Sequence, residues 1–221
     1  MVATIDGPAG VGKSTIARCV ADSCGFLYLN SGSFYRAITW AVLRSRQNPE
    51  DSAAILAVAS ECNLDMRDGA LSLDGRIVEQ EIHTDEVDRW VARHSSIPEV
   101  RDVVNRELRR LSQGRDVVAD GRDMGTVVFP LAEIKVFLDA TVETRAERRF
   151  KQGTSRLSLE EISRAIAERD RVDRSKAVGR LDVAPGALYI ETSHLTIPQV
   201  CDRVAQAILV RKNHLGDTRR V

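Results

Sequence analysis

The residues best suited to do chemistry lie near the start of the chain, where Gly7-Pro8-Ala9-Gly10-Val11-Gly12-Lys13-Ser14 matches the phosphate-binding pattern G-x-x-x-x-G-K-[ST]. An apolar run at 2–6, typical of a buried strand, precedes this loop, and apolar residues at helical spacing follow it over 14–23. Glycines allow successive N–H groups to turn toward one anion, and a helix N-terminus adds positive potential there. Lys13 could reach the outer phosphates, and the Ser14 hydroxyl could hold Mg²⁺. The sequence therefore predicts a nucleoside triphosphate site made by Gly7, Pro8, Ala9, Gly10, Val11, Gly12, Lys13, Ser14 and Thr15.

A second chemically suggestive group is a run of basic residues late in the chain. Phosphoryl transfer places charge on phosphoryl oxygens, and arginines that close over phosphates stabilise that charge. Acidic residues are interleaved with them, so a solvated helical face laced with salt bridges is the alternative. Because the chain also has a phosphate loop, we favour a lid over 151–179. The basic residues are Arg145, Arg148, Arg149, Lys151, Arg156, Arg164, Arg169, Arg171, Arg174, Lys176 and Arg180.

The composition is that of an ordinary globular protein. The 221 residues are 43% hydrophobic, and 32 basic side chains balance 32 acidic ones. A general nucleic-acid binder usually has a basic excess, so we expect no nucleic-acid partner. No apolar run approaches the 18 or so residues of a membrane span, and the first strand leaves no room for a signal peptide. We therefore expect a cytoplasmic protein with no membrane partner. Since no long exposed apolar stripe suggests an interface, we also expect a monomer.

The four cysteines, Cys19, Cys24, Cys62 and Cys201, form neither a C-x-x-C pair nor a metal-ligand cluster. Cys19 and Cys201 lie in apolar helical patterns, which predicts buried free thiols and fits a reducing compartment.

The remaining pattern predicts the elements that must position these residues. Four further apolar strands, at 26–30, 116–120, 134–139 and 187–190, join the first one with helices between them, which is typical of a doubly wound α/β sheet. Asp-Gly pairs at 68–69 and 74–75 separate short alternating segments and predict an antiparallel meander. Ser31 is the expected N-cap of a helix that reaches Arg46. Helices are also expected at 84–94, 98–112 and 197–211, with a frayed tail after Lys212.

With these motifs in place, the chain resembles the bacterial cytidylate kinases, a family of P-loop nucleoside monophosphate kinases. Five stretches carry the resemblance in the order of the family: 5–14, 31–36, 98–101, 120–130 and 168–173. The most specific is D-G-R-D-M-G-T-V-V-F-P at 120–130. The resemblance implies a P-loop fold with a five-stranded parallel sheet, whose core is 1–46, 113–150 and 180–221 and whose monophosphate-binding insertion is 47–112.

The resemblance also implies an activity, the transfer of the γ-phosphoryl group of ATP to CMP or dCMP with Mg²⁺. Ser31, Arg101 and Asp123 would recognise cytosine, because a carboxylate accepts from its exocyclic amino group while uracil presents a carbonyl there. Arg36 and Arg122 would bind the acceptor phosphate, and Arg169 and Asp173 the sugar hydroxyls. Lys176 would bridge the phosphates. The expected catalytic residues are Lys13, Arg122, Arg169 and Lys176.

Two positions depart from the family pattern. Lys176 stands where the family usually has arginine, and a lysine lacks the planar fork that makes bidentate phosphate contacts. Ala92 stands at a position that we associate, in this family, with a side-chain hydroxyl that contacts the base.

The nearest alternative function is that of another small kinase, such as a UMP/CMP, adenylate or shikimate kinase. The insertion and the D-G-R-D turn argue against these kinases. A nucleotide-dependent switch is a second alternative, but this chain has no N-K-x-D guanine-binding motif. An ATP-dependent nucleic-acid protein is a third, but the sequence shows no basic groove interleaved with aromatic residues.

Overall fold

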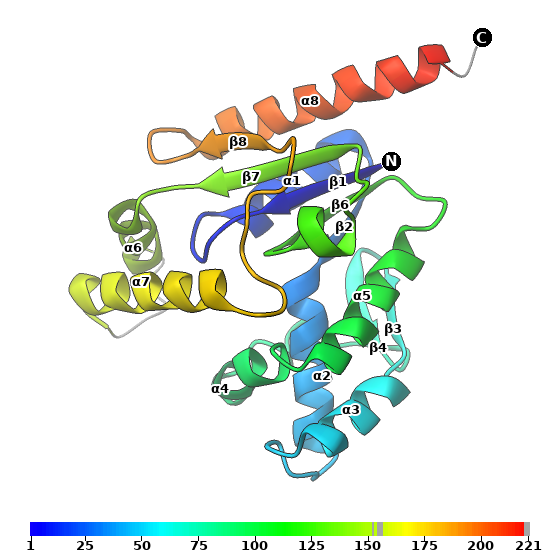
Figure 1. Cartoon of the computed structure of the whole chain (residues 1–221), viewed down its shortest axis with the longest axis vertical. Coiled ribbons are helices and arrows are strands. Elements are labelled where there is room, and N and C mark those ends of the chain that lie inside the picture. The colour runs from blue at the N-terminus through cyan, green and yellow to red at the C-terminus, as the bar shows by residue number, and fades with distance from the viewer. Residues whose placement is uncertain (152, 154–156, 219–221) are drawn as a thin grey trace. The chain divides into compact units, whose positions relative to one another are not determined.

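The computed structural model describes residues 1–151, 153 and 157–218, in two compact units. The sheet unit comprises Met1–Tyr28 and Asp116–Val221, and the meander unit comprises Leu29–Arg115. The sheet unit (Figure 1) contains β1 (Val2–Asp6), α1 (Lys13–Cys24), β6 (Val117–Gly121), the π-helix η1 (Met124–Val128), β7 (Ile134–Asp139), α6 (Val142–Lys151), α7 (Leu159–Ser175), β8 (Leu188–Glu191) and α8 (Ile197–Thr218). Strand β2 (Leu27–Asn30) crosses into the meander unit, which contains α2 (Ser31–Arg44), α3 (Ser52–Glu61), β3 (Leu64–Arg67), β4 (Ala70–Leu73), β5 (Arg76–Ile77), α4 (Asp85–His94) and α5 (Pro98–Ser112).

The sheet unit is built on a five-stranded parallel sheet in the order β2-β6-β1-β7-β8. Strand β1 lies between β6 and β7, and the register pairs Asp6 with Gly121 and with Phe137. The carboxyl ends of three neighbouring strands therefore lie at one edge, where open α/β sheets bind ligands. The predicted α/β sheet is confirmed, with the strands expected at 116–120 and 187–190 starting one residue later.

The core of this unit packs α1 and α8 against the sheet. Two cysteines in that contact, Cys19 of α1 and Cys201 of α8, form a disulfide with their Cα atoms 6.3 Å apart. The prediction that both are free thiols is wrong, because the two helices bring residues 182 positions apart together. Cys24 and Cys62 are free. Structural disulfides are rare in reducing compartments, so this bond does not support the expected cytoplasmic location.

Helix α8 runs alongside β7 and β8 in Figure 1 and continues to Thr218. The prediction of a frayed tail after Lys212 is therefore wrong for residues 213–218, which continue the helix. The Lys212 ammonium donates to Asp116 at 2.9 Å and lies 5.0 Å from the centre of the Phe26 ring, which anchors this end of the helix. Among the described residues, no helix is both long and apolar enough to span a bilayer.

The meander unit confirms the predicted hairpins. Strand β4 pairs antiparallel with β3 and with β5, and Asp68 and Asp74 at the turns have positive φ values of 52° and 50°. The N-cap of α2 is Asn30, whose side chain accepts from the Ser33 N–H at 2.9 Å. The prediction of Ser31 as N-cap is wrong by one residue, since Asn30 is an equally good cap and lies directly at the strand end.

Helices α6 and α7 lie beyond the arrowhead of β7 in Figure 1 and pack through Ala146, Ile162 and Ile166. Ser158 and Glu161 form a capping box that starts α7. Arg156, one of the basic residues assigned to the lid, lies outside the described residues. The predicted division into core, insertion and lid is a functional one and stays a prediction.

Candidate active site

The phosphate loop connects the carboxyl end of β1 to the start of α1. Gly12, the N-cap of α1, has φ 98°, which a residue with a side chain rarely adopts. At Gly7 the constraint is close approach, because an added Cβ would lie 2.2 Å from the Leu138 carbonyl oxygen. These two glycines explain why the strand can turn directly into a helix whose first N–H groups face an anion.

Lys13, the first residue of α1, is folded back over this loop. Its side chain is 6% exposed, and its ammonium donates to the Pro8 carbonyl at 2.7 Å. Burial, and after it the charge of Arg122, lowers the pKa of Lys13 well below its ordinary value. Asp120 and Asp6 act in the opposite direction. Additional negative charge, such as that of a phosphate, would favour the ammonium form in the same way.

Next to Lys13, the Ser14 hydroxyl and the Asp120 carboxylate form the place best suited to a hard cation. The Ser14 hydroxyl donates to Asp120 at 2.9 Å, and the Tyr28 hydroxyl donates to the other oxygen of that carboxylate at 3.0 Å. Burial raises the pKa of Asp120, opposed by Lys13 and by these hydrogen bonds. Mg²⁺ binds through one or two protein oxygens together with substrate phosphates, so Ser14 and Asp120 fit it. Among the residues that the structure describes, no cluster of three or more acidic, His or Cys ligands exists.

The segment after β6 is fixed through the buried carboxylate of Asp6. This carboxylate accepts from the N–H groups of Met124 at 2.9 Å and Gly125 at 2.7 Å. Burial raises the pKa of Asp6 to about 6, against those two hydrogen bonds. The Asp123 carbonyl accepts from the Val127 N–H at 2.9 Å and from the Val128 N–H at 3.1 Å, and the second bond, which spans five residues, starts the π-helix. Hydrogen bonds thus hold the backbone on the C-terminal side of Asp123. This role of Asp6 was not predicted from the sequence.

Three of the predicted substrate residues form one ionic cluster. The Asp173 carboxylate accepts from the Arg122 guanidinium at 3.0 Å and from the Lys176 ammonium at 2.8 Å. Burial opposes ionisation of Asp173, but Arg122 and Lys176 together lower its pKa below the ordinary value. Arg169 is near enough to lower the pKa of Lys13. The sheet unit therefore brings Lys13, Ser14, Arg122, Arg169, Asp173 and Lys176 together.

Two arginines of α6 that belong to the basic run, but precede the predicted lid at 151–179, contact backbone carbonyls. Arg145 is 3% exposed and donates to the carbonyls of Ala9 and Ala140, both at 3.0 Å. It also donates to both carboxylate oxygens of Asp170. Arg148 donates to the Val11 carbonyl at 3.4 Å and the Thr192 carbonyl at 2.6 Å. Sequence could show only their one-turn spacing and not these partners.

The other predicted substrate residues belong to the meander unit. Ser31 begins α2, and Arg36 on the same helix pairs with Asp88 and donates to the Ile82 carbonyl at 3.2 Å. Arg101 of α5 lies over the Tyr35 ring, 5.4 Å from its centre, and donates to the Ser95 carbonyl at 3.2 Å.

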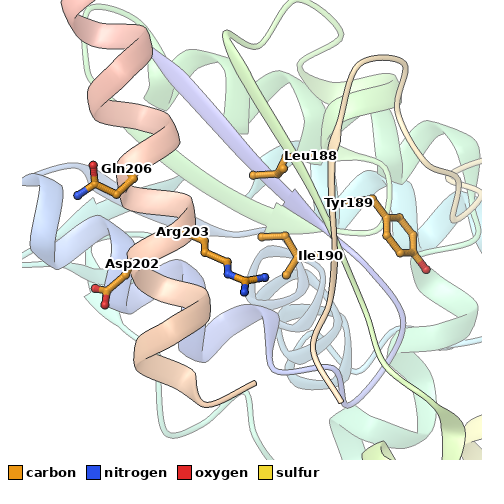
Figure 2. A pocket seen from close by; sticks show the side chains of 6 residues that line it. All are labelled: Leu188, Tyr189, Ile190, Asp202, Arg203 and Gln206. Atoms are coloured by element: carbon orange, nitrogen blue, oxygen red, sulfur yellow. The ribbon is translucent and has the colours of Figure 1, made fainter. Parts of the chain in front are cut away.

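A hollow beside the edge strand β8 is separate from these groups. Figure 2 shows Leu188 and Ile190 pointing toward Arg203 on α8, while Tyr189 points to the opposite side of the strand. Its hydroxyl donates to Asp139 at 2.7 Å, and this hydrogen bond, followed by burial, raises the pKa of Tyr189 to about 12. Because none of the predicted site residues lines this hollow, we assign it no part in the phosphate site.

Comparison with solved structures supports the P-loop kinase fold. A gluconokinase from Sinorhizobium meliloti 1021 has a TM-score of 0.52 at 13% identity, covering 98% of this chain and 96% of that one. A shikimate kinase from Acinetobacter baumannii in complex with shikimate has a TM-score of 0.50 at 19% identity, covering 96% and 94%. At these identities the likeness shows the fold alone.

Comparison with known sequences is more specific. The family model described as cytidylate kinase matches residues 3–209. A cytidylate kinase of Caldanaerobacter subterraneus subsp. tengcongensis is 41% identical over 217 residues, which cover 96% of both chains. A cytidylate kinase of Rhodopirellula baltica is 38% identical over 211 residues, covering 94% of this chain and 92% of the relative. The chain therefore belongs to the cytidylate kinase family.

Proposed function

We propose that this protein transfers the γ-phosphoryl group of ATP to CMP or dCMP, giving ADP and CDP or dCDP. The observation that carries the proposal is the register of β1 with β6. It places the phosphate loop beside the Asp120-Gly121-Arg122-Asp123 turn, with Asp6 opposite Gly121. One edge of the sheet thus carries both the phosphate-loop motif and the turn that is most specific to the family.

Within the sheet unit, each group has a role in direct in-line transfer. The loop N–H groups and Lys13 would hold the donor phosphates, and Ser14 with Asp120 would hold Mg²⁺. When bound, the ion would neutralise charge on the phosphate oxygens. The acceptor phosphate of CMP is already ionised at neutral pH, so the reaction needs no general base and Asp120 need not act as one.

Within the sheet unit we assign Asp123 to the cytosine base of the acceptor, Arg122 to its phosphate, and Arg169 and Asp173 to its sugar. Within the meander unit, the resemblance to the family assigns Ser31 and Arg101 to the base and Arg36 to the phosphate. Asp123 gives discrimination, because its carboxylate accepts from the amino group of cytosine and would be left unpaired against the carbonyl of uracil. The Asp123 backbone is suited to this task because hydrogen bonds fix the segment that follows it.

The cluster around Asp173 supports a role for Arg122 and Lys176 with phosphate. Asp173 holds both cations within hydrogen-bond distance of one carboxylate. A phosphate group offers the same charge-assisted contacts with more oxygens, and it can therefore compete for these donors. Lys176 would contribute a point charge rather than a bidentate fork.

The test is turnover with alternative acceptors. ADP release from ATP and Mg²⁺ would be measured with CMP, dCMP, UMP, AMP and shikimate, for the wild type and for Asp123→Ala. We expect turnover to be strongest with CMP and dCMP, and the variant to lose much of the preference for CMP over UMP. Asp182→Ala, at an exposed carboxylate, is the control and should keep the wild-type preference. Equal use of UMP by the wild type would overturn the cytosine assignment.

A further inference from the structure

The phosphate loop is bound from its outer side by two arginines one turn apart on α6. Arg145 donates to the Ala9 carbonyl at 3.0 Å, and Arg148 donates to the Val11 carbonyl at 3.4 Å. The contact is close, since a Cβ added to Gly10 would lie 3.5 Å from the Arg145 Cβ. Helix α6 thus covers the face of the loop that presents carbonyl oxygens.

Peptide geometry gives these contacts a consequence for the opposite face of the loop. The described part of the chain has no cis peptide bonds, and in a trans peptide the C=O and N–H groups point in opposite directions. Fixing the Ala9 carbonyl therefore fixes the direction of the Gly10 N–H, and fixing the Val11 carbonyl fixes that of the Gly12 N–H. Glycine peptides need such fixing most, because they are the freest to rotate.

Arg145 also connects the loop to α7. Its guanidinium donates to Asp170 at 3.1 and 2.5 Å, and with its bonds to Ala9 and Ala140 it makes four described hydrogen bonds out of five possible donors. Asp170 lies between Arg169 and Asp173 on α7, which carries the proposed acceptor-binding groups. Among the described residues, Arg148 has no hydrogen bond or ion pair with α7, and besides Val11 it donates to Thr192.

We propose that Arg145 and Arg148 are positioning residues that orient the Gly10 and Gly12 N–H groups toward the donor phosphates, and that Arg145 in addition holds α7 in register with the loop. Neither acts by contacting phosphate. Only the expected change in CMP affinity rests on the proposed function.

The test compares Arg145→Lys and Arg148→Lys with Arg203→Lys, the same substitution at an exposed arginine of α8 (Figure 2). Lysine keeps the charge but cannot span two acceptors with a planar fork. Calorimetry with Mg²⁺-ADP and with CMP, and the backbone amide NMR signals of Gly10 and Gly12 without ligand, are the readouts.

We expect both variants to bind ADP about tenfold more weakly, the effect of roughly one lost charge-assisted hydrogen bond. Arg148→Lys should leave CMP affinity unchanged, whereas Arg145→Lys should weaken it as well, through α7. In ligand-free protein the Gly12 signal should move selectively in Arg148→Lys and the Gly10 signal in Arg145→Lys. Arg203→Lys should change none of these.

Wild-type ADP affinity in both variants would overturn the proposal. Weaker ADP binding with unmoved glycine signals would also overturn it, because it would indicate direct contact with the nucleotide. If Arg145→Lys does not fold, the Arg148→Lys variant, at a half-buried position, still tests the proposal through its ADP affinity and the Gly12 amide signal. A wild type that binds ADP but not CMP would refute the proposed function while leaving the ADP and NMR tests of this inference intact.

Discussion

Replacing Asp173 by asparagine removes the one carboxylate that holds Arg122 and Lys176 together. The two ion pairs measure 3.0 and 2.8 Å, and the three side chains are 24%, 7% and 23% exposed in the order Arg122, Asp173, Lys176. At such distances and an effective dielectric constant of about 20, each pair gains roughly 6 kcal/mol of Coulomb attraction. Desolvation takes back most of this, so we expect the variant to lose about 2 kcal/mol of unfolding free energy at neutral pH.

The pH dependence identifies the cause. Because the folded-state pKa of Asp173 lies below its unfolded value, the ionised carboxylate stabilises the fold above the unfolded pKa. That contribution disappears as the pH falls through the folded-state pKa. The difference between wild type and Asp173→Asn should therefore be largest near neutral pH and shrink below about pH 4, the ordinary pKa of an aspartate.

Urea denaturation followed by circular dichroism, at neutral pH and at acid pH where both proteins still fold, measures the difference. Asp182→Asn is the matched control, because its pair with Arg180 is 48% and 57% exposed. Such an exposed pair contributes less than about 1 kcal/mol. A loss for Asp173→Asn no larger than that of the control, or one independent of pH, would show that the Asp173 ion pairs do not stabilise the fold.

Three further predictions concern other parts of the molecule. Burial lowers the pKa of His94, so the unfolded state takes up the proton first and stability should fall as the pH drops below about 6.5; His94→Gln should flatten this dependence in urea titrations, and an NMR titration of His94 at its ordinary pKa would contradict it. Gly125→Ala would place a Cβ 2.9 Å from the Thr4 hydroxyl and 3.1 Å from the Ala184 Cβ, so we expect a loss of about 1–3 kcal/mol on urea unfolding and impaired turnover; unchanged stability would show that the segment can move aside. Thiol titration of the unreduced, unfolded chain should find only Cys24 and Cys62, and reduction of the Cys19–Cys201 bond should lower the unfolding free energy by about 3 kcal/mol; four reactive thiols before reduction would exclude the bond.

Local chemistry made some of the fold predictable from the sequence. Gly7 and Gly12 mark places where only a residue without a side chain fits, so the strand, loop and helix around them could be recognised directly. The Asp-Gly pairs at 68–69 and 74–75 likewise predicted the meander, since both aspartates have the positive φ that such turns require.

Features that depend on packing between distant segments were missed. Cys19 and Cys201 look like core residues of separate helices, and only the contact of α1 with α8 pairs them. Asp6 ends an apolar strand, and its two hydrogen bonds go to residues about 118 positions away. From the sequence, Arg145 and Arg148 were grouped with the other residues of a basic run. A sequence shows the charge of an arginine, but it does not show whether the partner is a phosphate, a carboxylate or a carbonyl.

In the proposed reaction a phosphoryl group passes from ATP to a cytidine monophosphate. We would follow the protein with ATP, Mg²⁺ and CMP by phosphorus NMR, which separates ATP, CMP, nucleoside diphosphate and inorganic phosphate, and then resolve CDP from ADP by anion-exchange chromatography. We expect CDP and ADP to appear in equal amounts, with no inorganic phosphate. ADP accompanied by inorganic phosphate, or ATP that binds but is never consumed, would contradict the account.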